Sequence, residues 1–266
     1  MSMWKECEGL QEELVKIRRE LHQIPEFGLD LPETQKYVTD KLDELGIPYK
    51  CSGTDSSIIA EIKGGQPGKT VALRADMDAL KITEANDVDY KSKHEGLMHA
   101  CGHDNHIAML LGAAKVLNAH KAEIKGNVRL LFQTAEELSK GAEIMIKDGA
   151  MDGVDAVFGQ HIGSIINKDI PAGKVIVTPG CCMASFDRFV IHVKGTGCHG
   201  STPEKGTDPI TMASHIVINL QEIIAREVSA VKAAVVTIGY FHGGVAYNAI
   251  PSEVEIEGTI RALEEP

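Results

Sequence analysis

The sequence predicts an α/β protein in which a domain with a mostly parallel sheet precedes a smaller α+β, ferredoxin-like domain. In the first part of the chain, short apolar strand patterns alternate with helical patterns, an order typical of parallel sheets. Beyond about residue 180, strands of alternating polarity surround one long helical pattern in the order β-α-β-β. We place the domain boundary so that the domains are 1–181 and 182–266.

The first domain begins with two predicted helices. Residues 10–22 repeat apolar side chains at helical spacing. Pro32 at a first turn and Gly46 at the end are typical bounds of a second helix. The later elements are strands at 56–64, 69–76, 127–134 and 154–161 and helices at 104–120 and 142–149.

The second domain is predicted to contain strands 185–195, 233–244 and 253–263 and a helix at 208–228. A complete β-α-β-β-α-β unit needs one more helix and one more strand. We therefore expect both domains to be incomplete at the C-terminus.

Composition excludes several classes of protein. The chain of 266 residues has a formal net charge of −11, which argues against a nucleic-acid or anionic-membrane partner. It contains no run of the ~20 apolar residues that a membrane span needs, and its N-terminus lacks the pattern of a signal peptide. Six scattered cysteines do not form a disulfide scaffold. We expect a cytoplasmic protein.

The densest group of chemically active side chains lies at residues 99–106. His99, Cys101, His103, Asp104 and His106 fall where a loop enters a helix. Thiolate and neutral imidazole bind zinc and similar divalent metals, and a nearby carboxylate can orient such a ligand. A solvated, polar helix start is the alternative, but the density of ligand-type residues favours a metal site.

Two further features follow apolar strands. Glu136 and Glu137 follow one strand, and one of them could bind a metal ion while the other accepts a proton from metal-bound water. Taken alone, the pair is more typical of a helix N-terminus. His161 follows the next strand, where a lone histidine is often structural. Because parallel strands end at one edge of a sheet, we expect these side chains to meet there. Asp76 and Asp78 follow another strand and could support the site.

The second domain offers three candidates of its own. His199 lies in a Gly-rich turn, Asn248 lies in a loop, and Arg261 ends a strand. An arginine suits bidentate binding of a carboxylate. Each residue could equally be a loop imidazole, a turn residue or a surface charge, and spacing alone rejects none of these.

The sequence resembles the amidohydrolase branch of the aminoacylase/carboxypeptidase-type metallopeptidases, which includes hippurate hydrolases, auxin-conjugate hydrolases and N-acetyl-diaminopimelate deacetylases. The resemblance covers nearly the whole chain, and the motif MHACGHD followed by the glutamate pair is highly specific. The matching stretches are RRELHQIPEFGLDLPET, LRADMDAL, MHACGHDNHIAMLLGAA, LLFQTAEE, GAMDGVDAVFGQHI, GTGCHGSTPEKGTDPI and AYNAIPSEVEIEGTIRA.

The resemblance implies a dinuclear site that holds two divalent ions, with Zn, Mn, Co and Ni all open. Cys101, His103, Glu137 and His161 would be metal ligands, with Cys101 bridging the two ions. Glu136 would be the general base. His106 belongs to the motif but would not be a ligand.

The resemblance also implies that 1–181 is the metal-binding catalytic domain and that 182–266 is a lid and dimerisation domain with roles of its own. His199 would stabilise the oxyanion, often from across a dimer, and Asn248 and Arg261 would contact the substrate. The expected reaction is hydrolysis of an N-acyl amino acid to a carboxylate and an amino acid, by a homodimer formed through the lid domain. Thr134 and Glu204 depart from the usual pattern, and the second departure affects the rim of the substrate site.

Two alternatives stay open. The chain could be a non-catalytic fragment that binds metal weakly and self-associates, because family members continue past Pro266 to a last metal-ligating histidine. It could instead be a dipeptidase or carboxypeptidase with the same site. A nucleotide-binding enzyme is disfavoured, since neither a GxGxxG pattern nor a P-loop follows the first strand of the chain.

Overall fold

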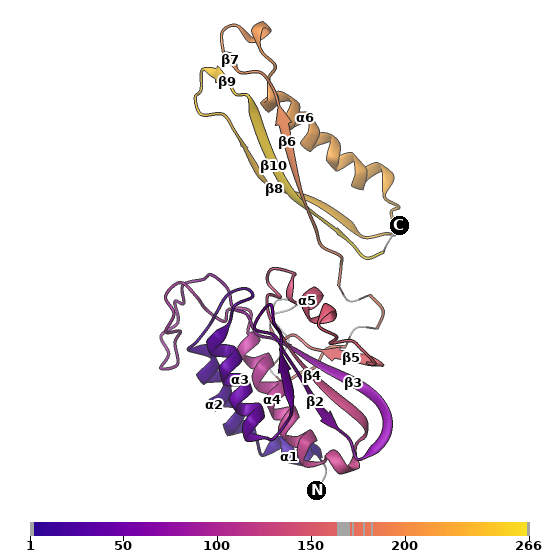
Figure 1. The fold of residues 1–266 in the computed structure, drawn as a ribbon. Coiled ribbons are helices and arrows are strands. Elements are labelled where there is room, and N and C mark those ends of the chain that lie inside the picture. The colour runs from indigo at the N-terminus through magenta and orange to yellow at the C-terminus, as the bar shows by residue number, and fades with distance from the viewer. Residues whose placement is uncertain (1–2, 164–170, 172, 178, 182, 265–266) are drawn as a thin grey trace. The chain divides into compact units, whose positions relative to one another are not determined.

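The computed structural model divides the chain into two compact units, Met1–Pro171 and Ala172–Pro266 (Figure 1). The boundary expected from the sequence falls a short way inside the second unit. No helix among the described residues is both long and apolar enough to cross a bilayer. The described residues are 3–163, 171, 173–177, 179–181 and 183–264.

The first unit is built on a five-stranded sheet with the order β1-β2-β4-β3-β5. Strands β4, β3 and β5 are parallel neighbours, whereas β2 is antiparallel to both β4 and β1. Within this sheet β2 alone therefore opposes the common direction, and the mostly parallel architecture is confirmed. The bounds are β1 Tyr49–Cys51, β2 Ile58–Lys63, β3 Gln66–Asp76, β4 Lys125–Gln133 and β5 Ala156–Gly159.

Helices cover both faces of this sheet (Figure 1). The larger apolar core joins α2, α3 and α4 to the inward side chains of β2 and β4, and a smaller core lies on the face that α5 covers. These two cores explain why the central strands read as nearly continuous apolar runs. The bounds are α1 Met3–Glu8, α2 Gln11–His22, α3 Pro32–Glu44, α4 His103–Ala119, the 3-10 turn η1 Lys121–Glu123 and α5 Gly141–Lys147.

The three parallel strands end at the same edge of the sheet. Asp76 at the end of β3 pairs with Gln133 at the end of β4, and Arg74 pairs with Gly159 at the end of β5. Helix α4 begins beside them at His103. A long loop, residues 77–102, connects β3 to α4 and carries Cys101 to this edge.

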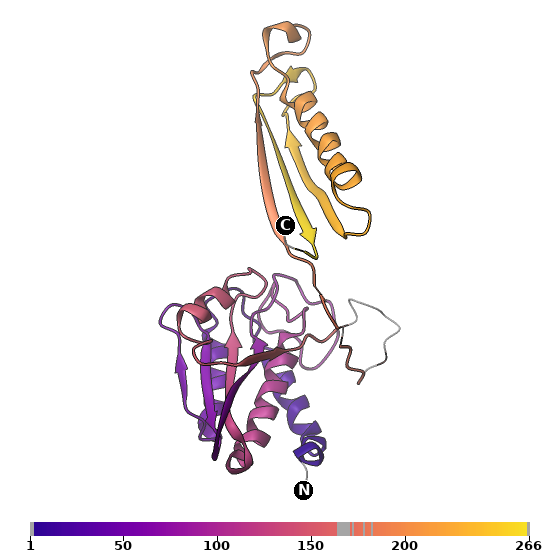
Figure 2. The same cartoon turned by 90° about the vertical axis from the view of Figure 1, so that its right-hand side faces the viewer.

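The second unit is an α+β structure in which α6 packs along one face of a three-stranded antiparallel sheet of order β6-β10-β8 (Figure 2). This arrangement confirms the predicted β-α-β-β order. A separate ribbon pairs β7 with β9. The bounds are β6 Asp187–Lys194, β7 Cys198–His199, η2 Pro203–Lys205, α6 Pro209–Glu222, the π-helical turn η3 Ile223–Glu227, β8 Ala234–Gly243, β9 Ala249–Ile250 and β10 Glu253–Ala262.

Candidate metal centre

Side chains suited to metal binding gather at the carboxyl edge of the first sheet. Three groups each bring their ligand atoms within 4.8 Å of one another, and His103 belongs to all three. The groups are Cys101–His103–His161, His103–Glu136–Glu137 and Asp76–His103–His106. Every residue expected from the sequence to bind metal in the first domain is therefore part of one cluster around His103.

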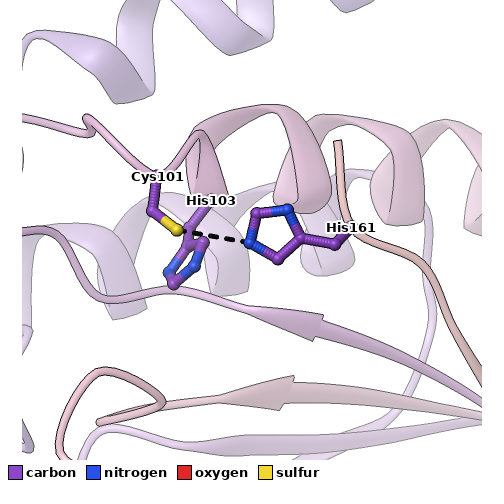
Figure 3. A group of neighbouring side chains, drawn as sticks. All are labelled: Cys101, His103 and His161. Atoms are coloured by element: carbon purple, nitrogen blue, oxygen red, sulfur yellow. Dashed lines mark hydrogen bonds between the residues drawn. The ribbon is translucent and has the colours of Figure 1, made fainter. Parts of the chain in front are cut away.

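Cys101 and His161 face each other across this cluster (Figure 3). The Cys101 Sγ lies 3.2 Å from the His161 Nε2. Gly102, between Cys101 and α4, has a φ of +88° and a close neighbour, because a Cβ there would lie 2.7 Å from the Ile162 Cδ1. A glycine at this position thus allows the loop that carries Cys101 to approach the segment that carries His161.

The glutamate pair is held in a turn directly after β4. Ala135 has a φ of +46°, a left-handed conformation that costs a non-glycine residue about 1–3 kcal/mol. The buried Asp78 carboxylate accepts hydrogen bonds from the backbone N–H of Glu136 at 3.0 Å and of Glu137 at 3.1 Å. These bonds aim both glutamates at His103, whose Nε2 lies 3.9 Å from an oxygen of each carboxylate.

The polar atoms at the centre of the cluster lack partners within the described residues. His103 is fully buried, yet neither ring nitrogen has a hydrogen bond, and the buried Glu137 Oε1 also has none. Buried polar groups in native proteins are nearly always satisfied. A divalent cation would satisfy these nitrogen, oxygen and sulfur donors together, so the residues present fit a metal ion.

The charges of the cluster also fit a cation. Burial, together with the nearby Glu137, raises the pKa of the Cys101 thiol to about 12. Burial and the charge of Asp76 raise the pKa of Glu136. Burial lowers the pKa of His103, but the carboxylates of Asp78 and Asp76 outweigh it, so that the net shift is upward. The site therefore concentrates negative charge that a divalent ion would neutralise.

His106 links two neighbouring parts of the cluster through its two ring nitrogens. Its Nδ1 donates to the buried Asp76 carboxylate, and its Nε2 accepts a hydrogen bond from the Ile162 N–H at 2.9 Å. The Asp76 carboxylate also accepts from the Arg74 guanidinium at 2.7 Å. Because both His106 nitrogens are engaged, this residue is placed to hold the loop beside His161.

Sequence reasoning missed a second buried network behind this cluster. His22 bridges Asp104 at 2.7 Å and Glu84 at 3.2 Å, and the Arg18 Nε lies 2.9 Å from Asp104 without being aimed at it as a hydrogen-bond donor. The available signal was the match of RRELHQIPEFG to family sequences. Spacing along the chain could not find the network, because its members lie on α2, the long loop and α4.

The candidates of the second unit do not form a single group. His199 lies on β7 opposite Ala249, and the Gly200 N–H donates to the Asn248 carbonyl at 2.8 Å, so that His199 and Asn248 are neighbours. Arg261 lies near the other end of β10, roughly 25 Å of strand away. Its guanidinium stacks 4.6 Å from the Phe186 ring centre. This unit does not by itself bring Asn248 and Arg261 to one carboxylate.

Residues 72–262 match the model of Peptidase family M20/M25/M40, and the chain belongs to this family. The family expected from the sequence is confirmed, and its members described below are hydrolases.

Three relatives illustrate the match. The N-acetyl-L-cysteine deacetylase of Bacillus subtilis is 44% identical over 96% of this chain, and the match spans 60% of the deacetylase. The thermostable carboxypeptidase 2 of Saccharolobus solfataricus is also 44% identical, over 96% of this chain and 65% of its own length. A dinuclear metal-binding M20 peptidase of Bacillus subtilis superposes with a TM-score of 0.80 at 38% identity, with 97% of this chain and 66% of that chain covered.

Proposed function

We propose that this chain carries the metal site of an amidohydrolase that cleaves N-acyl amino acids to a carboxylate and an amino acid. The single observation that carries the proposal is the buried His103, whose two ring nitrogens make no hydrogen bond among the described residues while Cys101, Glu136, Glu137 and His161 surround it. The 44% identical deacetylase of Bacillus subtilis supports an amide of this kind.

Cys101, His103, Glu137 and His161 would hold two divalent ions, with Zn and Mn as the first candidates. Bound ions of this type supply a Lewis acid and lower the pKa of water towards neutrality. His106 and Asp78 hold the ligands in position through the Ile162 N–H and the backbone of the glutamate pair. The Cys101 thiol must lose its proton when it becomes a ligand.

Glu136 would act as the general base. Its side chain is 40% exposed, so substrate and water can reach it, whereas Glu137 is 18% exposed. The pKa of Glu136 is raised, first by burial and then by Asp76, which makes its carboxylate a stronger base than an ordinary glutamate. Its carboxylate would take a proton from the attacking water and return it to the nitrogen of the leaving amine.

The second unit would contribute His199 to stabilise the developing oxyanion and Asn248 and Arg261 to bind the substrate. We propose a cytoplasmic homodimer formed through this unit. Large apolar side chains are exposed on it, among them Ile218 at 61% and Tyr247 at 102% of their free accessible areas, which supports self-association. Sedimentation of the chain at several concentrations tests this part of the proposal, and a strict monomer at all of them contradicts it.

A peptidase is the second candidate function, because the thermostable carboxypeptidase 2 matches this chain as well as the deacetylase does, at 44% identity over 96% of the chain. The two candidates differ in the bond they cleave fastest. We would assay the zinc- or manganese-loaded chain on N-acetyl and N-benzoyl amino acids beside dipeptides with a free amino terminus. Faster hydrolysis of the acylated amino acids supports the amidohydrolase, and faster hydrolysis of the dipeptides supports the peptidase. No turnover despite bound metal refutes catalysis by this chain.

A further inference from the structure

We propose that His22 is a positioning residue for the candidate metal centre, because its ring ties the long loop that carries Cys101 to the first turn of α4, which begins with His103. The consequence for metal binding rests on the proposed function. The tie itself is a set of contacts within the first unit.

His22, the last residue of α2, stands between two buried carboxylates. Its Nδ1 lies 2.7 Å from the Asp104 Oδ2, and its Nε2 lies 3.2 Å from the Glu84 Oε1. None of the three side chains is more than 2% exposed. Because a carboxylate accepts hydrogen bonds and cannot donate them, both ring nitrogens carry protons and the ring is a cation. His22 thus joins two buried anions, and removing one partner of such a buried pairing is costly.

The two carboxylates belong to different parts of the site. Asp104 directly follows His103 in the first turn of α4. Glu84 lies in the long loop, where it also accepts the backbone N–H of Ser92 at 2.7 Å. Glu84 therefore draws two parts of the loop together, and His22 fixes them to the helix that begins with His103.

The chain that follows His22 makes similar connections with its backbone. The Glu26 carbonyl accepts the Ala79 N–H at 2.7 Å, near the start of the long loop. The Gly28 carbonyl accepts the Ala135 N–H at 3.0 Å, in the turn that carries the glutamate pair. Two parts of the site are thus bound to the segment after α2, and His22 adds the link to α4.

This arrangement matters for a metal ion because Cys101 and His103 lie on either side of the junction between the loop and α4. A metal ion tolerates deviations of only about 0.2 Å in its ligand distances. If the loop moves relative to α4, the Cys101 thiol leaves its place while His103 stays on the helix. Losing a direct partner of a ligand typically costs about 10- to 100-fold in metal affinity, and His22 acts through Asp104, so we expect about tenfold.

The test replaces His22 by glutamine, which keeps a donor group but carries no charge. His120→Gln is the matched control, because His120 also lies between two carboxylates, with Glu6 at 2.9 Å and Glu123 at 3.0 Å, but at the other end of α4. Ile62→Ala controls for lost stability, because Ile62 is a buried core residue on β2 near the end that lies away from the site.

Glu84→Gln approaches the same tie from the loop and decides the test if His22→Gln does not fold. Three quantities are measured on each full-length variant. Competition with a chromophoric chelator gives the zinc affinity, and the thiolate-to-cobalt charge-transfer band of the cobalt-loaded chain reports whether a thiol is a ligand. Hydrogen exchange of the Ser92 amide in the metal-free chain reports the docking of the loop.

We expect His22→Gln to bind zinc about tenfold more weakly and to show a weaker cobalt band at equal cobalt. Its Ser92 amide should exchange about tenfold faster, as expected when one charged hydrogen bond no longer opposes local opening. Glu84→Gln should change all three quantities in the same direction. His120→Gln and Ile62→Ala should leave them unchanged, although Ile62→Ala lowers the urea midpoint of unfolding.

Unchanged zinc affinity and an unchanged cobalt band in both His22→Gln and Glu84→Gln overturn the positioning role and leave the proposed function intact. An equal loss of zinc affinity in Ile62→Ala also overturns it, since lost stability then explains the effect. If the wild type binds no zinc, the proposed function fails and exchange alone decides the tie. Faster exchange confined to the loop in His22→Gln then supports it, and unchanged exchange overturns it.

Discussion

Replacing Asp78 by asparagine tests how the glutamate pair is held. The Asp78 carboxylate is fully buried and accepts the backbone N–H groups of Glu136 and Glu137 at 3.0 and 3.1 Å. An asparagine of nearly the same shape offers one carbonyl oxygen for one of these donors, while its amide N–H₂ faces the other. One buried N–H is then left unpaired and the charge assistance is lost.

The expected loss in the free energy of unfolding follows from these two hydrogen bonds. A hydrogen bond to a charged group contributes about 1.5–3 kcal/mol, and an unpaired buried donor costs about 1–3 kcal/mol. We expect the free energy of unfolding of the metal-free chain to fall by about 2–4 kcal/mol. Since the turn also carries the strained Ala135, the glutamates should move, and zinc affinity should fall about 10- to 100-fold, the usual effect of losing a group that orients a ligand.

Urea unfolding measures the first quantity, and competition with a chromophoric zinc chelator measures the second. Asp40→Asn is the matched control, because Asp40 is an exposed partner of Lys36 on α3 and should change neither quantity appreciably. A zinc affinity within twofold of the wild type in Asp78→Asn would refute the idea that this carboxylate positions the metal ligands, whatever happens to stability.

Three further predictions concern the same edge of the sheet. Glu136→Gln should reduce turnover at least about a hundredfold with metal content near normal; loss of metal with activity retained would disprove the base assignment. Cys101→Ser should lower metal occupancy, and because the thiol pKa is raised to about 12, zinc binding at pH 7 should release one more proton in the wild type than in the variant; equal proton release, measured by calorimetry in two buffers, would remove Cys101 from the ligands. Burial raises the pKa of Asp76, but His106, His103 and Arg74 outweigh it and hold it at about 2; the stability this gives is present above pH 4 and should be lost, by about 2 kcal/mol, as pH falls from 4 to 2 in the metal-free chain. Asp76→Asn should flatten that loss, and an unchanged acid transition in the variant would contradict the assignment.

The part of the site that depends on parallel strands could be predicted from the sequence. Glu136 and His161 each follow an apolar run, and parallel strands must end at one edge. The pairing of Asp76 with Gln133 and of Arg74 with Gly159 produces this edge. Local pattern and one topological rule were sufficient, because each functional residue is fixed to the strand or helix next to it.

The sequence pattern did not give the direction of β2 or the contacts of the buried polar network. The pattern of β2 reads the same whichever way the strand runs, and its direction is set by its antiparallel pairing with β4. His22 and Asp104 are 82 residues apart and meet only through the packing of α2 on α4. Likewise, neither ring nitrogen of the buried His99 makes a hydrogen bond within the part of the chain that the structure describes, and spacing does not encode this.

In the second unit, distance along the chain does not indicate which candidate residues lie together. Asn248 and Arg261, which the resemblance implies contact the substrate, are close in sequence. The extended strand β10 separates them, because a strand advances about 3.3 Å for each residue. His199, which is far from Asn248 in sequence, is instead its neighbour through the β7–β9 ribbon. Proximity along the chain was therefore a poor guide to proximity in this unit.

The most direct test of the central claim is the metal content of the purified chain after saturation with zinc and exhaustive dialysis, measured by elemental analysis. We predict about two zinc ions per chain, as expected for a dinuclear centre, and a marked loss of zinc in a variant that lacks both the Cys101 thiol and the His103 imidazole. Equal zinc contents in the wild type and in that variant would contradict the assignment of a metal centre to this edge of the sheet.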